Sequence, residues 1–158
     1  MGEPRLRAPH VVLASASPAR LALLRAAGIR PTVLTSGVDE DVLVAAADPA
    51  VRRDGAALTQ QLARAKAGDV ADRITRGDPG APVGDTLVVG ADSMLAHAGQ
   101  LLGKARSADE VRSRWARMAG GTGALVTGHT VVHLPSGRVA EAAVATTIRF
   151  GRPTPEEL

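Results

Sequence analysis

The sequence predicts an α/β fold. Uncharged runs rich in Val and Leu alternate along the chain with segments whose apolar residues follow helical spacing, and helix-capping residues come directly after the first of these runs. The chain has 158 residues, of which 45% are hydrophobic, so it can bury the core of one domain. Trp115 and Phe150 are the only residues of the Phe, Trp and Tyr class, so we expect a core of Val, Leu, Ile and Ala.

Strands and helices are expected at short intervals. Runs containing β-branched residues predict buried strands, and residues 95–102, with Gly99 near their middle, predict a hairpin. The first helix is marked by Ser17 as its cap, Pro18 at its first position and Gly28 at its end. The predicted strands cover residues 11–14, 32–35, 86–91, 125–134 and 138–150, and the predicted helices cover residues 17–28, 56–74 and 107–119.

Two further helix starts are visible in the second half. Ser107 and Glu110 have the spacing of a capping box, in which each side chain accepts a hydrogen bond from the other residue's backbone N–H. Thr154-Pro155 followed by two acids has the pattern of another start, and the chain ends soon afterwards. We therefore expect residues 1–158 to form a single domain that lacks its C-terminal segment.

Composition excludes several classes of protein. Without cysteine, the chain has no disulfide framework, no thiolate zinc site and no cysteine nucleophile. No apolar run approaches the roughly 20 residues of a membrane span, and residues 1–9 do not contain the apolar core of a signal peptide. We therefore expect a cytoplasmic protein that has no membrane partner.

The charge pattern argues against a nucleic-acid partner. The formal net charge is only +3, and the cations are scattered along the chain. Two aromatic residues are too few for a surface that stacks bases. Retention on heparin or DNA across a range of salt concentrations would test this alternative function.

Lysine is rare in this chain. Of its 19 Lys and Arg residues, all but Lys66 and Lys104 are arginine. A lysine in such a sequence marks a position where a compact ammonium is needed, for instance beside a phosphate, unless its presence is due to chance.

Two acidic residues follow apolar runs and are candidates for chemistry. Asp92 comes directly after the uncharged run 88–91, and in α/β folds the carboxyl ends of strands line ligand crevices. A carboxylate there would hold Mg²⁺ or Mn²⁺, or accept a proton from water. Glu40, in the polar, acidic loop expected at residues 36–41 after the second strand, would be a second ligand. The alternatives are a turn residue for Asp92 and a solvated loop residue for Glu40.

A third candidate group follows the first predicted strand. The N-terminus of the helix after Ser15 offers N–H groups to an anion, and Arg20 would add a guanidinium fork. The alternative is that Ser17 only caps the helix and Arg20 is only solvated. Two acids, two lysines, one arginine and a helix N-terminus are the groups needed for moving phosphoryl or nucleotidyl groups.

Seven short motifs occur in order along the chain. They are residues 13–20, 39–40, 63–67, 89–93, 102–104, 118–120 and 126–128. This set, which covers about residues 10–150, resembles the Maf family of nucleoside triphosphate pyrophosphatases, in which the motifs have the same order. The resemblance implies an α/β fold with a mixed, elongated, twisted sheet flanked by helices, and two lobes around a deep cleft, similar to inosine triphosphate pyrophosphatases.

The resemblance also implies an activity and a role for each candidate residue. Family members hydrolyse the α–β phosphoanhydride of nucleoside triphosphates to a nucleoside monophosphate and pyrophosphate, helped by a divalent cation. Asp92 is implied as the general base or a metal ligand, Glu40 as a metal ligand, and Ser93 as a residue linked to base selection. The residues implied to hold the triphosphate and to stabilise its developing charge are Ser15, Arg20, Lys66 and Lys104.

Three departures from the family pattern affect what the resemblance implies. Ala19 stands where many members that act on thymidine or uridine triphosphate have Arg and another subgroup has Trp, so the base preference stays open. Ala105 replaces the usual Pro after Lys104, which loosens that turn. Family members also continue past residue 158 with a Gly-rich segment and a Gln that contacts the base.

A second function is compatible with the same motifs. Family members have been associated with septum formation, so the chain could be a non-catalytic, nucleotide-binding regulator. The acids and lysines favour the enzyme, because a protein that only binds nucleotide has little use for a water-activating acid. A homodimer is the oligomeric state that the resemblance implies.

Overall fold

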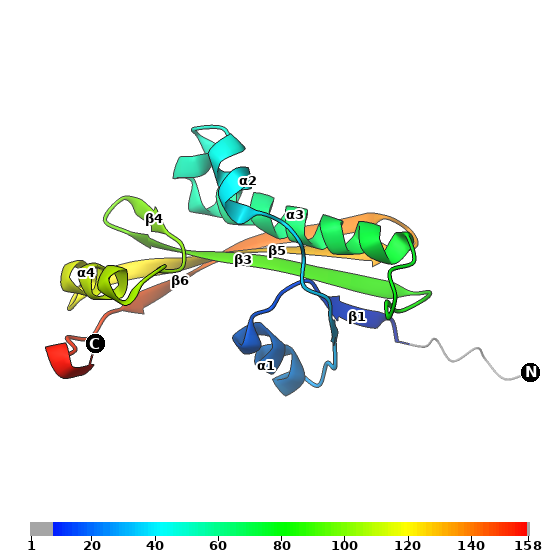
Figure 1. Cartoon of the computed structure of the whole chain (residues 1–158), viewed down its shortest axis with the longest axis horizontal. Coiled ribbons are helices and arrows are strands. Elements are labelled where there is room, and N and C mark those ends of the chain that lie inside the picture. Colours follow the sequence, from blue (N-terminus) through cyan, green and yellow to red (C-terminus); the bar gives the residue numbers. More distant parts are fainter. Residues whose placement is uncertain (1–7, 158) are drawn as a thin grey trace, which may run out of the picture. The chain divides into compact units, whose positions relative to one another are not determined.

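The computed structural model describes residues 8–157, and it confirms the predicted α/β class with a mixed sheet flanked by helices (Figure 1). The six strands of these residues form one sheet of order β2-β1-β3-β5-β6, and β4 pairs with β3 outside this path. The strands are β1 (His10–Leu13), β2 (Thr32–Val33), β3 (Thr86–His97), β4 (Gln100–Leu102), β5 (Thr122–Leu134) and β6 (Arg138–Arg149). The helices are α1 (Pro18–Ala26), α2 (Glu40–Ala46), α3 (Gly55–Thr75) and α4 (Ala108–Met118), with 3₁₀ turns at Val51–Arg53 and Pro155–Glu157.

Parallel and antiparallel pairs coexist in this sheet. Strand β1 is parallel to both β2 and β3, and its residues His10 to Leu13 pair with Thr86 to Val89. Strand β4 is antiparallel to β3, and the turn between them contains Gly99, which confirms the predicted hairpin. Gly99 has a φ of 75°, a left-handed conformation that glycine adopts without steric cost.

The chain divides into two compact units, which are described separately below. Helix α3 and strands β3, β5 and β6 each contribute residues to both units. Unit 1 consists of the chain up to Val38 together with residues 63–91 and 130–141, and unit 2 consists of residues 39–62, 92–129 and 142 onwards.

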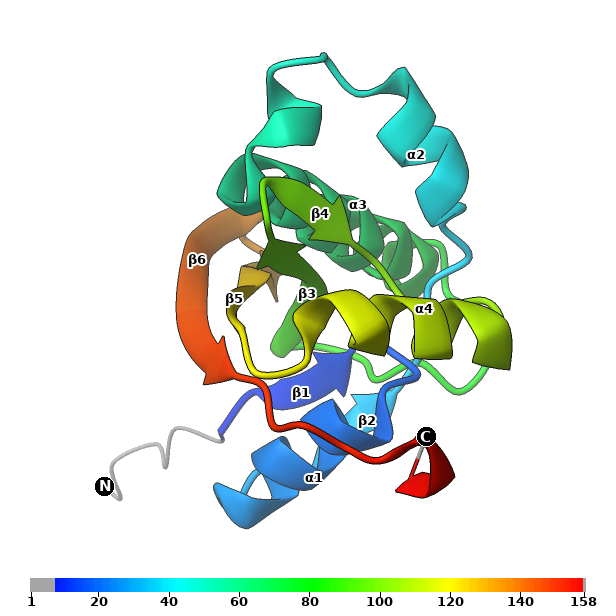
Figure 2. The same cartoon turned by 90° about the vertical axis from the view of Figure 1, so that its left-hand side faces the viewer.

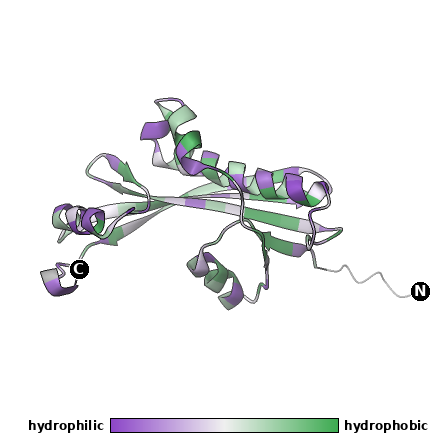
Figure 3. Ribbon diagram, viewed as in Figure 1, coloured by the Kyte–Doolittle hydropathy of each residue, from purple (hydrophilic) through white to green (hydrophobic). Residues whose placement is uncertain are grey.

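The core of unit 1 lies between α3 and the parallel strands. Val12 of β1 and Ala14, the residue that follows this strand, belong to one buried cluster with Val88 of β3. This cluster includes Ala67 and Val70 of α3. Helix α1 lies on the opposite face of the sheet from α3 (Figures 1 and 2). Strand β1 is hydrophobic, whereas hydrophilic residues recur along α3 (Figure 3).

Helix α3 approaches strand β3 very closely at Gly90. A Cβ atom added to Gly90 would lie 2.8 Å from both the backbone nitrogen and the Cβ of Ala67, and it would collide with the carbonyl oxygen of Ala63. Only glycine fits there, because carbon atoms in contact are about 3.5–4.0 Å apart. This contact sets the depth at which α3 packs on the sheet in unit 1.

Unit 2 has a separate core and a small aromatic cluster. Leu58 and Leu62 of α3 pack with Ala47, and neighbouring apolar residues from α2, β3 and β4 complete the cluster. Phe150 makes edge-to-face contacts with both His97 and Trp115, each with ring centroids 5.9 Å apart. The two aromatic residues noted in the sequence therefore contact each other at one place in unit 2.

Two sequence expectations about helix starts need correction. Residues 36–41 were expected to form a polar loop, but Asp39 caps α2 by accepting a hydrogen bond from the N–H of Val42 at 3.1 Å, and Glu40 is the first helical residue. The capping box at α4 forms only in part. Ser107 accepts from the N–H of Glu110 at 3.1 Å, whereas the Glu110 carboxylate accepts from Arg106 instead of Ser107.

Within residues 8–157, no helix is both long enough and apolar enough to cross a membrane.

Candidate functional site

The seven candidate residues are divided between the two units. Unit 1 holds Ser15, Arg20 and Lys66, and unit 2 holds Glu40, Asp92, Ser93 and Lys104. Among them, the structure brings Ser15 and Arg20 into direct contact.

Ser15 and Arg20 lie just beyond the end of β1. Ser17 caps α1, as predicted, by accepting a hydrogen bond from the N–H of Arg20 at 3.4 Å. The buried hydroxyl oxygen of Ser15 accepts from Arg20 Nη1 at 3.0 Å and from the N–H of Ser17 at 3.2 Å. Since both lone pairs are then used, the remaining hydrogen-bonding function of Ser15 is to donate its proton, which suits an anionic partner.

Arg20 also has a structural contact. Its Nη1 donates to the carbonyl oxygen of Ala91 at 2.8 Å, at the residue before Asp92. The reading of Arg20 as a merely solvated side chain is therefore wrong. One guanidinium nitrogen of Arg20, a residue in the first turn of α1, thus donates both to the hydroxyl of Ser15 and to the backbone of β3.

We expect Arg20→Lys to lower the free energy of unfolding by about 1–2 kcal/mol, because the lysine side chain is shorter and more flexible, and its ammonium does not reach both acceptors that Arg20 Nη1 contacts in good geometry. Arg25→Lys is the matched control, since Arg25 is an exposed residue of the last turn of α1. Urea titration of both variants measures the difference. Equal midpoints for the two variants would contradict this role of Arg20.

Lys66 is buried in unit 1. It lies on α3 next to the core residue Ala67, and its residue exposure is only 7%. Burial of an ammonium is unfavourable unless the charge is compensated, and Lys66 has interaction partners. A solvated surface position is therefore excluded for this lysine.

Asp92 does not end a strand, contrary to the expectation. Strand β3 continues to His97, because its residues from Leu95 to His97 pair with β4, so Asp92 lies in the middle of a strand of 12 residues. Asp92 has an exposure of 5% and has interaction partners. The alternative reading as a solvated turn residue is thereby excluded.

Ser93, Glu40 and Lys104 complete the candidate set. The hydroxyl of Ser93 is 2.9 Å from that of Thr127 on β5, within hydrogen-bond distance. Glu40 lies in the first turn of α2, where the partial positive charge of the helix N-terminus stabilises a carboxylate. Lys104 is exposed, on an irregular segment between β4 and α4.

The segment that carries Lys104 is held by side chains that the sequence reading did not identify. Arg114 of α4 donates through Nη1 to the carbonyl oxygen of Gly103, and through Nη2 it forms an ion pair with Glu110. The second oxygen of Glu110 accepts from the backbone N–H of Arg106 at 2.8 Å. The spacing of Glu110 and Arg114 was the available signal, because residues four apart face each other on a helix.

This arrangement lowers the pKa of Glu110. The N–H of Arg106 is the main cause, followed by the hydrogen bond from Arg114. A carboxyl whose pKa is lower in the folded state stabilises the fold above its unfolded pKa, which for Glu lies near 4.5, and this stabilisation is lost as the pH falls through the folded value.

We therefore expect the thermal midpoint of the wild type to fall as the pH is lowered from 6 to 3 by more than the midpoint of Glu110→Gln. The neutral side chain has no proton to gain, so the variant is less stable at pH 6 and the difference shrinks below pH 4.5. Calorimetry at several pH values measures this. A constant difference between the two proteins across the range would contradict it.

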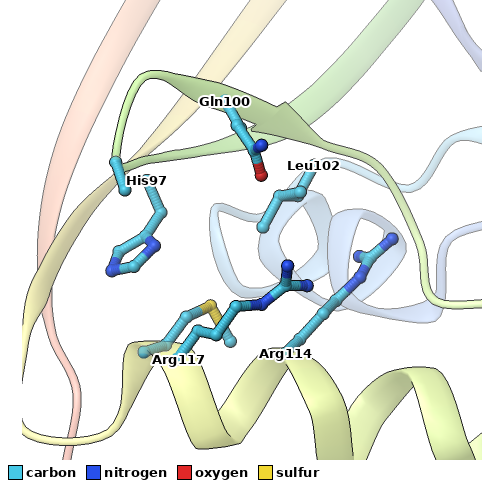
Figure 4. A pocket seen from close by; sticks show the side chains of 7 residues that line it. His97, Gln100, Leu102, Arg114 and Arg117 are labelled. Atoms are coloured by element: carbon cyan, nitrogen blue, oxygen red, sulfur yellow. The ribbon is translucent and has the colours of Figure 1, made fainter.

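Two pockets lie apart from the candidate residues. In unit 2, a pocket of about 240 Å³ separates the β3–β4 hairpin from α4, with His97, Gln100 and Leu102 on one side and Arg114 and Arg117 on the other (Figure 4). In unit 1, a more open groove of about 500 Å³ runs between α3 and strands β5 and β6. Neither is lined by any of the seven candidates.

The two candidate acids are carboxylates, the side chains that Mg²⁺ prefers. In the described part of the chain, no group of three or more His, Cys, Asp or Glu side chains is placed to hold a metal ion. Mg²⁺ is commonly bound through one or two carboxylates together with water and substrate phosphates, and both candidate carboxylates, Glu40 and Asp92, belong to unit 2.

The fold and these side chains define an α/β protein with buried charges of both signs. The chain belongs to the Maf family, since the family described as Maf-like protein matches residues 10–158. It is 48% identical over 151 residues to the nucleoside triphosphate pyrophosphatase of Nocardia farcinica, covering 94% of this chain and 68% of the relative. Proteins of the same name from Mycobacterium tuberculosis and Rhodococcus jostii are 48% and 45% identical over 154 and 152 residues, covering 94% and 93% of this chain and 67% of each relative.

Proposed function

We propose that this chain hydrolyses the α–β phosphoanhydride bond of nucleoside triphosphates, releasing a nucleoside monophosphate and pyrophosphate and consuming one water molecule. The observation that carries the proposal is the identity of 45–48% to relatives that bear the name nucleoside triphosphate pyrophosphatase. An enzymatic function is favoured over that of a non-catalytic regulator, because the acids and lysines of the motifs are all present.

Asp92 is the proposed general base. Water attacks phosphorus faster as it loses a proton, and a carboxylate at a fixed position accepts that proton. Burial of Asp92 supports this role, because a side chain held among strand neighbours is ordered before the substrate arrives. Its place in the middle of a strand, between residues that pair with β1 and with β4, gives it a rigid backbone.

Positive and hydrogen-bonding groups are proposed to hold the triphosphate. Negative charge develops on phosphate oxygens during the reaction, and fixed cations stabilise it. We assign this role to Lys66, Lys104 and Arg20, and a hydrogen-bond donor role to Ser15. Two observations support the assignment: Ser15 accepts two hydrogen bonds, which leaves its proton for a donor role, and Lys66 is buried.

A divalent cation, Mg²⁺ or Mn²⁺, is the proposed cofactor. Glu40 and Asp92 would hold it, and when bound it would neutralise charge on the phosphate oxygens. Asp92 is therefore proposed as the general base, as a metal ligand, or as both in turn, since one carboxylate can accept a proton or bind a cation. Ser93, hydrogen-bonded to Thr127, is proposed to contribute to the choice of base.

We also propose that the protein acts in the cytoplasm, where nucleoside triphosphates are abundant, and as a homodimer. The family resemblance supports the dimer. Light scattering after size-exclusion chromatography tests it, since one chain has a mass of 16.1 kDa.

Monophosphate formation tests the enzymatic function. The purified chain is incubated with each common nucleoside triphosphate and Mg²⁺ or Mn²⁺, and the products are separated by ion-exchange chromatography. Turnover of one or more substrates to the monophosphate supports the proposal and ranks the bases. Nucleotide binding without any product would instead favour the non-catalytic regulator.

A further inference from the structure

The backbone around Lys104 is anchored on both sides of the lysine. On one side, Arg114 binds the carbonyl oxygen of Gly103, and on the other, Glu110 binds the N–H of Arg106 at 2.8 Å. Both anchors come from α4, and they are joined to each other by the ion pair of Glu110 with Arg114. The segment is therefore attached to a helix at two points only three residues apart in the sequence.

This segment needs such support because its own sequence is flexible. Gly103 and Ala105 have little or no side chain to restrict the backbone, and residues 103–105 belong to no helix or strand. Lysine itself has four rotatable side-chain bonds, so an unanchored backbone would leave its ammonium poorly placed.

The contacts of Arg114 are better protected from water than other ion pairs of the same region. Its side chain is only 16% exposed, whereas that of Arg112, which pairs with Asp109 on the same helix, is 53% exposed. Figure 4 shows Arg114 extending from α4 toward the β4 side of the pocket. Arginine is suited to this position because its planar fork reaches two acceptors with different nitrogens.

A second tether is more exposed. The guanidinium of Arg106 binds both carboxylate oxygens of Asp41 at 2.8 Å, and Asp41 follows Glu40 in the first turn of α2. Both side chains are more than three-quarters exposed, so water and salt weaken this pair. The less exposed part of the network, Arg114 with Glu110, is the part expected to matter most.

We propose that Arg114, together with Glu110, is a positioning residue that fixes Lys104 for its contact with the substrate phosphates. The inference rests on the proposed function of Lys104. Neither Arg114 nor Glu110 is assigned a contact with the substrate; they act through the backbone of residues 103–106.

Four proteins test this inference beside the wild type: Lys104→Ala, Arg114→Met, the double variant, and Arg112→Met as the control on the same helix. We expect Arg114→Met to lower kcat/KM about 10- to 100-fold, because displacement of a catalytic group by about 1 Å costs up to about 100-fold. The double variant is expected to equal Lys104→Ala, since positioning has no value once the ammonium is gone. The kcat/KM of Arg112→Met is expected to stay within about twofold of the wild-type value, because an exposed ion pair contributes little.

The outcomes separate the inference from the function on which it rests. One outcome would show that the positioning role is wrong. In it, the wild type is active and Lys104→Ala has a reduced kcat/KM, but the kcat/KM of Arg114→Met equals that of Arg112→Met. Multiplicative losses in the double variant would also overturn it, because they indicate independent effects. Absence of turnover in the wild type itself would overturn the proposed function and this inference together.

Loss of folding would be a different cause of low activity, so a second variant is included. Arg114→Lys keeps the charge and the apolar stem, but its ammonium does not span both acceptors. We expect it to have the thermal midpoint of Arg112→Met and yet a kcat/KM below that of the wild type. Wild-type kcat/KM in Arg114→Lys would contradict the two-acceptor role of the guanidinium.

Discussion

The Asp92→Asn variant is expected to hydrolyse nucleoside triphosphates about 10²- to 10⁴-fold more slowly than the wild type, which is the contribution of a positioned proton acceptor. Asparagine has nearly the same shape as aspartate, so the β3 backbone and the neighbours of this buried side chain stay in place. The amide oxygen neither accepts a proton at neutral pH nor carries the charge that a cation needs.

A matched control separates this loss from a general effect of removing an acid. Asp109 is 91% exposed and pairs with Arg112 on the surface of α4, so Asp109→Asn is expected to retain wild-type turnover. Initial rates for both variants, with far-ultraviolet circular dichroism to confirm folding, give the comparison. A folded Asp92→Asn protein with wild-type turnover would show that Asp92 has no part in the chemistry.

The Gly90→Ala variant is expected to lose about 3 kcal/mol of stability, the upper part of the range for overpacked sites. The added methyl group would lie 2.8 Å from Ala67 and would meet the backbone of α3 rather than a movable side-chain end. For a chain of this length, the thermal midpoint would fall by roughly 6–12 °C. Gly128→Ala is expected to behave likewise in unit 2, because its Cβ would lie 2.5 Å from the carbonyl oxygen of Thr59.

Gly68→Ala is the internal control for both variants. Gly68 lies within α3, and a Cβ atom there meets nothing within 4 Å. Replacing a helical glycine that has free space by alanine stabilises a helix by about 0.5–1 kcal/mol. The effect of Gly68→Ala therefore differs in sign as well as in size from that of the other two variants, and calorimetry resolves the difference. Similar midpoints for Gly68→Ala and Gly90→Ala would contradict the close packing of α3 on β3.

Much of the fold could be predicted because its signals are local. The Ser17-Pro18 start of α1, the apolar spacing of α3 and the glycine turn of the β3–β4 hairpin each lie within a few residues. Helix α2 was missed because it has only seven residues and contains Val42 and Val44, whose branched side chains favour strands. Its acidic first turn was read as a loop, although acids there also mark a helix start.

The candidate residues were found from motifs, but their surroundings depend on distant parts of the chain. Asp92 was expected at the end of a strand because it follows the uncharged run 88–91, and only the pairing of β3 with β4 shows that the strand continues. Arg20 contacts a carbonyl 71 residues away, and Arg106 contacts Asp41 at a separation of 65 residues. Such pairs follow from the packing of elements and have no local sequence signal.

The position of the labelled phosphate after hydrolysis tests the central claim most directly. The wild-type chain is incubated with its preferred nucleoside triphosphate carrying radioactive phosphorus at the γ position, without any added pyrophosphatase, and the products are separated by thin-layer chromatography. The proposed cleavage of the α–β bond places all of the label in pyrophosphate. Label in orthophosphate from the first time points, with nucleoside diphosphate as the partner product, would mean that the β–γ bond is cut and would contradict the proposed reaction.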